Sequence, residues 1–161
     1  MFSFVVLQAF GLIADALVVA AQTMADPTLL LLIFLVVLFG MFMGAVPGLG
    51  GIITLTLLIP LTFGMEPIVA FMLLAAALGA TNFGGSITAI LINTPGSAVN
   101  AATILDGYPM ARQGRAREAL GAAATASAVG AMFGLVVLFL SIPVMMEILL
   151  MFSQIEIFWL G

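Results

Sequence analysis

The sequence predicts an all-α polytopic membrane protein with interrupted helices, on three observations. Of its 161 residues, 65% are hydrophobic and only 6% are charged, whereas about a quarter of the residues in soluble domains carry a charge. Two stretches, 27–65 and 67–105, contain no charged residue. About 20 apolar residues suffice to cross a bilayer, so each stretch is too long for one simple span. Prolines and glycines interrupt both stretches, which predicts broken or re-entrant helices.

The residue types that are missing limit the chemistry. The chain has no cysteine and no histidine, so it lacks disulfides, thiolate ligands and the commonest metal ligand and neutral-pH acid-base group. Its acidic residues are scattered singly rather than gathered in a tail. We therefore expect no catalytic residues, no metal, no cofactor and no nucleic-acid partner, and the protein is not expected to be an enzyme.

We expect a single membrane domain over residues 1–161. Residues 1–25 are interpreted as an interfacial helix and not as a signal peptide, because they have no basic n-region and carry Asp15 within the apolar stretch. Residues 27–105 form two blocks with broken helices. Residues 106–118 form a cytoplasmic loop, and residues 119–161 supply further spans, the first of them ending at Pro143.

The first block has a helix start and a helix break. Asp26 is a suitable N-cap, and Pro27 fits the first helical position because its missing N–H has no helical partner there. Gly40 and Gly44 have the four-residue spacing that lets helices approach closely in lipid. The sequence PGLGG (Pro47–Gly51) should interrupt the helix, since proline removes a donor and glycine favours non-helical backbone.

The second block repeats this organisation. Glu66 and Pro67 resemble another N-cap and first-turn pair. The helix that follows is expected to end at Gly84 and Gly85, with a further segment running to a second break at Asn93–Ser97, of sequence NTPGS. Both breaks follow an apolar run and precede small or hydroxyl residues.

A polar segment follows the second block. The sequence DGYP favours a turn with a structural rather than a functional carboxylate, because aspartate hydrogen-bonds nearby backbone in turns. This turn comprises Asp106, Gly107, Tyr108 and Pro109. All the basic residues of the chain come next, and lysine and arginine concentrate in cytoplasmic loops. We interpret them as topology determinants: Arg112, Arg115 and Arg117.

The two breaks together suggest a binding site. Unpaired backbone groups are not tolerated in hydrocarbon, so irregular backbone at membrane depth must be buried in protein or line a wet cavity. Transporters use broken helices to present half-helix N-termini to an anion, while freed carbonyls ligate a coupling cation. The alternative is that both breaks are kinks or interfacial turns. The candidate substrate-binding residues are Pro47, Gly48, Gly50, Gly51, Asn93, Thr94, Pro95, Gly96 and Ser97.

Uncharged polar side chains gather around the second break. Such donors can hold a carboxylate without the desolvation cost of a buried lysine or arginine. Asn93 and Ser97 flank the break and are the preferred candidates, whereas Thr88 and Thr103 can equally well bond to their own helices. The full set is Asn82, Ser86, Thr88, Asn93, Thr94, Ser97, Asn100 and Thr103.

Four segments, GAVPGLGG, LLIPLTFGMEP, GGSITAILINTPGSA and AATILDGYPMARQGRAREALG, resemble in order and spacing the N-terminal part of the large membrane subunit of bacterial tripartite tricarboxylate transporters, the TctA type. The resemblance covers about Leu30 to Gly134. It implies a multi-pass inner-membrane permease that works with a small membrane subunit and a periplasmic solute-binding protein. Uptake would be driven by a gradient of Na⁺ or H⁺ rather than by ATP, with citrate-like tricarboxylates, dicarboxylates or aromatic acids as substrates.

Two departures from the family pattern matter. Family members are several-fold longer, so we expect this chain to be the N-terminal portion of a permease. Members often carry aromatic residues before the Gly-Gly pair, where this chain has Leu78, Thr81 and Asn82 and keeps only Phe83, and some carry an acidic residue at the position of Ser97. The alternative function is a non-transporting scaffold or assembly subunit, or an inactive truncated fragment.

Overall fold

The structure is a computed structural model that describes residues 11, 15, 17–22 and 25–151. The chain divides into two compact units, Ala20–Ser127 and the remainder. All regular elements among the described residues are helices, which confirms the all-α prediction. Three helical segments are long and apolar enough to cross a membrane: Pro27–Ala45, Pro67–Ile92 and Ala116–Ile142.

Helix α2 (Pro27–Ala45) begins and ends where the sequence predicts. The Asp26 carboxylate accepts a hydrogen bond of 2.8 Å from the Thr28 N–H, which confirms the N-cap. The helix stops before Pro47, and the connection to α3 (Gly50–Leu58) includes Gly48 with φ of 90°. This left-handed backbone favours glycine. A short 3₁₀ turn, η1 (Ile59–Thr62), follows α3.

Helix α4 (Pro67–Ile92) is longer than expected. Glu66 occupies the N-cap position, although its side chain makes no capping bond. The expectation that this helix ends at Gly84 and Gly85 is wrong, because both glycines lie inside it. They serve close packing instead: a Cβ on Gly84 would overlap the backbone carbonyl of Met41 in α2.

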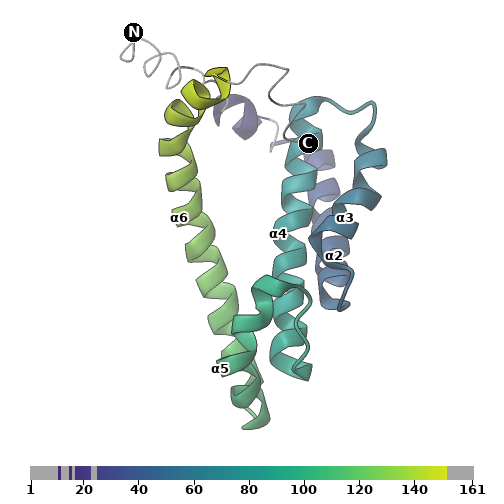
Figure 1. Ribbon diagram of the computed structural model, residues 1–161. Helices are drawn as coiled ribbons and strands as arrows, with labels where there is room; N and C mark the ends of the chain where they lie inside the picture. Colours follow the sequence, from purple (N-terminus) through teal and green to yellow (C-terminus); the bar gives the residue numbers. More distant parts are fainter. Residues whose placement is uncertain (1–10, 12–14, 16, 23–24, 152–161) are drawn as a thin grey trace. The chain divides into compact units, whose positions relative to one another are not determined.

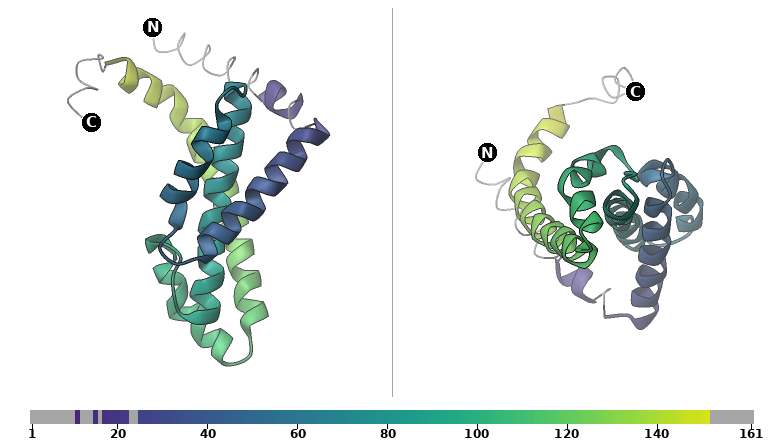
Figure 2. Two further views of the ribbon diagram at one scale, coloured as in Figure 1. Left: turned by 90° about the vertical axis from the view of Figure 1, so that its right-hand side faces the viewer. Right: turned by 90° about the horizontal axis from the view of Figure 1, so that it is seen from below.

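Helix α4 is the centre of the Ala20–Ser127 unit. Seen from below, it lies between α2 and α3 on one side and α5 (Ala101–Arg112) on the other (Figure 2). Helix α2 crosses it obliquely in the left view of Figure 2. The buried residues of α4 are mostly small, which allows the backbones of neighbouring helices to approach. They are Leu73, Ala77, Ala80, Thr81, Gly84, Gly85, Ser86, Ala89 and Ile90.

The turn expected at Asp106–Pro109 is wrong, because these residues lie within α5. Gly107 is buried where α5 meets α4, and a Cβ there would come within 2.7 Å of Ile90 Cγ1. Gly107 thus allows a close contact between α5 and α4 rather than forming a turn. Helix α5 ends at Arg112, and the chain reverses at Gly114 with φ of 79°. The turn that follows α5 lies at the bottom of Figure 1. Most of the expected loop 106–118 is therefore helical.

Helix α6 (Ala116–Met151) starts before residue 119 and continues through Pro143, so the expected end at Pro143 is wrong. A proline removes one helical hydrogen bond, but long apolar helices in membranes tolerate this. Within the Ala20–Ser127 unit, the first turns of α6 face α5, and Ala119 of α6 is buried. Of the expected interfacial helix 1–25, residues 17–22 are helical and most others lie outside the described residues.

Candidate functional site

Three backbone segments meet at glycines beside the second break. Gly44 comes from the end of α2, Gly85 from α4, and Gly96 from the break itself. A Cβ on Gly96 would overlap the carbonyl oxygen of Gly44 and the Cα of Gly85. The Gly96 N–H also donates to the Gly85 carbonyl, with an N···O distance of 3.4 Å. Only glycine permits this convergence.

The chain reaches this point by doubling back along α4. Asn93 caps the helix in the left-handed region with φ of 59°, a conformation that asparagine adopts more readily than most residues. The Thr94 N–H donates to the Thr88 carbonyl at 3.4 Å. After Pro95 the chain runs back until Gly96 is level with Gly85, and Ser97 is extended with φ of −148°. A 3₁₀ turn, η2 (Ala98–Asn100), then leads into α5.

Two polar side chains are buried together at this junction. Asn100 is 4% exposed and Ser86 is 9% exposed. The Ser86 hydroxyl donates to Asn100 Oδ1 at 3.3 Å. Asn100 Nδ2 has no hydrogen-bond partner within the described part of the chain, and neither has the buried Ser97 hydroxyl. A buried polar group left unpaired costs about 1–3 kcal/mol.

A second buried polar pair lies nearby and is fully bonded. Thr81 Oγ1 donates to the Ala77 carbonyl at 2.8 Å and lies 3.3 Å from Thr54 Oγ1. Thr54 in turn donates to the Gly50 carbonyl at 2.8 Å. This contact joins α3 to α4. The unpaired groups of Asn100 and Ser97 therefore differ from the buried hydroxyls around them.

The residues selected from the sequence are only partly brought together. In the second break, Gly96 is buried, whereas Asn93 and Thr94 are exposed. In the first, Pro47 and Gly48 are exposed. The end of α2 reaches the second break through Gly44, which the sequence indicated only as a packing glycine. Gly50 and Gly51 are already the first residues of α3.

Two residues of the junction were not selected from the sequence. Asn100 and Ser86 belong to the polar set around the second break, but nothing local distinguished them from their neighbours. Their burial depends on the doubling back of the chain, which a sequence pattern does not reveal. Thr88, in contrast, bonds to its own helix as anticipated, since its hydroxyl donates to the Gly85 carbonyl at 3.2 Å.

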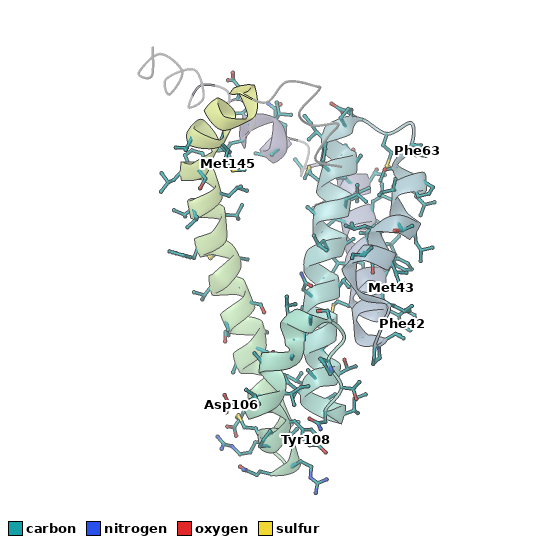
Figure 3. All side chains as sticks on the ribbon, in the orientation of Figure 1. Phe42, Met43, Phe63, Asp106, Tyr108 and Met145 are labelled. Atoms are coloured by element: carbon teal, nitrogen blue, oxygen red, sulfur yellow. The ribbon has the colours of Figure 1, made fainter. Side chains whose placement is uncertain are left out.

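The three arginines surround the turn between α5 and α6. Arg112 lies in the last turn of α5, where a positive charge favours the negative end of the helix dipole. Arg115 pairs with Glu118 at 2.6 Å. The Arg115 guanidinium donates hydrogen bonds to the Glu118 carboxylate, and these bonds, and secondarily the negative charge of Glu118, raise the pKa of Arg115. Asp106 and Tyr108 extend from α5 above this turn (Figure 3).

The junction itself contains no charged side chain, because residues 67–105 have none. Its free groups are an amide and a hydroxyl, which can donate to an oxygen of a bound anion. The described residues include no group of three or more Asp and Glu side chains that could hold a metal ion. The arrangement is suited to binding rather than to acid-base chemistry.

Comparison with known proteins shows the family of the chain. The model of the tripartite tricarboxylate transporter TctA family matches residues 30–161. The chain belongs to this family. A relative from Agrobacterium vitis, described as an uncharacterized 52.8 kDa protein in the TAR-I ttuC' 3' region, is 36% identical over 137 residues. That match covers 85% of this chain and 27% of the relative, and no solved structure matches the chain.

The chain thus combines membership of the TctA family with three helical segments that are long and apolar enough to cross a membrane. The resemblance drawn from the four sequence segments is confirmed. The chain spans 27% of the length of its relative from Agrobacterium vitis.

Proposed function

We propose that the chain forms part of a permease for citrate-like tricarboxylates and dicarboxylates in the bacterial inner membrane. A periplasmic solute-binding protein delivers the acid, a small membrane subunit completes the system, and a gradient of Na⁺ or H⁺ drives uptake by alternating access. The family supports the transport role and the tripartite assembly. The substrate class rests on the family description and on the neutral donors at the second break.

The observation that carries this proposal is the convergence of Gly44, Gly85 and Gly96 beside unpaired buried donors. Broken helices in transporters bring half-helix ends and irregular backbone to the substrate. Here the second break, Asn93–Ser97, doubles back into the contact between α2 and α4. The first break, Pro47–Gly51, follows directly after Gly44, so both breaks adjoin one junction.

Uptake of radiolabelled citrate tests the proposal. Cells producing the chain together with the other proteins of its transport system should accumulate citrate, and accumulation should stop when ionophores collapse the Na⁺ and H⁺ gradients. Gly96→Val and Gly48→Val should abolish uptake while leaving the protein in the membrane. Gly79→Ala is the matched control, since a Cβ at Gly79 meets no atom within 4 Å. Normal uptake by both valine variants would contradict the assignment of the two breaks.

An assembly subunit without a transport role is the alternative. It is favoured by the fact that Gly40, Gly44 and Gly84 all serve backbone packing. Under this alternative, the valine variants would weaken recovery of the other membrane subunit after solubilisation, and citrate would not protect the chain against thermal unfolding.

A further inference from the structure

We propose that Asn100 is a carboxylate-binding residue of this protein, with Ser97 as a second donor and Ser86 as the residue that positions the amide. The proposal rests on the proposed transport function and adds to it a specific subsite. The ligand group is a carboxylate oxygen of the transported organic acid.

The Asn100 amide nitrogen is buried and, within the described part of the chain, unpaired. Asn100 is 4% exposed, yet its Nδ2 has no partner among the described residues, while its Oδ1 accepts from Ser86. Buried side-chain donors are almost always bonded, and an exception calls for an explanation. The Ser86 hydroxyl holds Asn100 Oδ1, so the orientation of the amide is fixed and its two N–H groups remain available to an acceptor. A carboxylate is such an acceptor, whereas a cation is not.

The Asn100 amide occupies the space that a side chain at position 85 would take. A Cβ on Gly85 would overlap Asn100 Nδ2, and the same Cβ would lie 3.2 Å from the Cα of Gly96. The absence of a side chain at Gly85 therefore leaves room for the Asn100 amide. Preorganised donors bind better than mobile ones, because their ordering cost is met during folding.

Asn100 stands at the start of a helix. It precedes α5, a helix of 12 residues, and neither Asn100 nor Ser97 caps the backbone with its side chain. The positive end of the α5 dipole therefore lies beside both unpaired groups, and helix N-termini favour anions. Ser97 Oγ, also buried and unpaired, belongs to the same turn.

The depth of the subsite also suits a transport path. Asn100 bonds to Ser86, which is 19 residues after Pro67, or about 28 Å along α4 at 1.5 Å per residue. The turn at Gly114 is about 20 Å away along α5. Glu66 precedes the start of α4 and the three arginines lie at or beyond the last turn of α5, whereas Asp106 is about 9 Å along α5 from Asn100. No cation from this region neutralises the ligand, so selectivity depends on neutral donors.

Replacing the amide with a carboxylate separates anion binding from cation binding. Asn100→Asp keeps the shape but replaces donors with a negative charge. In cells producing the complete transport system, we expect the KM for citrate to rise about tenfold or more. The substrate carboxylate would lose the hydrogen bonds from the Asn100 amide and would face a negative charge in their place. The matched control is Gln113→Glu, the same chemical change at an exposed position in the α5–α6 turn.

Three further variants define the contributions of the other groups. Asn100→Leu removes the polar atoms and should raise the KM as much as Asn100→Asp. Ser86→Ala should raise it less, because this hydroxyl acts through the amide, and Ser86→Thr, which keeps the hydroxyl, should restore most of the affinity. Ser97→Ala should raise the KM for citrate more than the KM for succinate, which carries one carboxylate fewer. Membrane content and cooperative unfolding in detergent are measured for each variant.

The outcomes distinguish the two proposals. Wild-type uptake together with raised KM values in the Asn100 variants supports the subsite. Wild-type uptake with an unchanged KM in Asn100→Asp or Asn100→Leu overturns it and leaves the transport proposal intact. Uptake by Asn100→Asp that is maintained and depends more steeply on Na⁺ would also overturn it, because the amide would then face a cation. Failure of the wild-type system to take up or bind citrate or succinate would overturn both.

Discussion

Thr81 on α4 and Thr54 on α3 lie with their hydroxyl oxygens 3.3 Å apart in the buried contact between these helices. Each hydroxyl also donates to a carbonyl of its own helix, so neither group depends wholly on the other. Polar contacts between membrane helices contribute about 0.6 kcal/mol on average. The pair therefore positions α3 without dominating the stability of the unit.

A double-mutant cycle measures this contribution. We expect Thr54→Val and Thr81→Val each to lower the free energy of unfolding in detergent by about 1 kcal/mol, with a coupling near 0.6 kcal/mol. Valine preserves the shape and removes only the hydroxyl. A coupling energy of zero would show that the two oxygens do not interact.

The contact between α2 and α4 provides a second prediction. A Cβ on Gly84 would overlap backbone atoms of Met41, which cannot move as a flexible side chain can. We expect Gly84→Ala to lower the free energy of unfolding by about 1–3 kcal/mol. Gly79→Ala, on the same helix with open space around it, should be neutral or stabilising by up to about 1 kcal/mol. Equal effects of the two changes would contradict the packing.

Asn93 allows conformation to be separated from chemistry. Its φ of 59° suits glycine and disfavours β-branched residues. We expect Asn93→Gly to retain citrate uptake, whereas Asn93→Val loses stability by about 1–2 kcal/mol and loses uptake with it. Loss of uptake in a stably folded Asn93→Gly variant would instead assign the amide a direct role in binding.

The position of the basic turn can be tested by labelling. Because the chain contains no cysteine, a single introduced thiol is a specific reporter. We expect Gln113→Cys to react with a membrane-impermeant maleimide in inside-out vesicles and to be protected in intact cells. Phe63→Cys, placed before α4, should show the opposite pattern. Reaction of Gln113→Cys from outside would contradict the cytoplasmic assignment of the arginines.

Local sequence signals predicted the helix starts well. The Asp26 cap and the helix start at Pro67 depend on neighbouring residues only, and the structure shows both. The two breaks were also predicted, because proline and glycine act on the backbone where they stand. These features require no knowledge of what packs against the chain.

Features that depend on packing were predicted poorly. Gly84 and Gly85 were predicted to end a helix, and Gly107 was predicted to lie in a turn. Each of these glycines lies inside a helix where another segment approaches. A glycine that ends a helix and one that admits a neighbour have the same sequence signature. Asn100 was not distinguished for a similar reason, since its burial arises only after the chain has doubled back against α4.

This doubling back bears on how the polypeptide threads the bilayer. Residues from Asn93 onward return to the level of Gly85 and then descend as α5 to the turn at Gly114, on the side from which they came. The excursion therefore adds apolar length without adding a crossing. A topology that counts residues 98–112 as a transmembrane pass would invert the predicted sidedness of every segment that follows, whereas treating them as a re-entrant excursion counts a single crossing between Pro67 and the turn at Gly114.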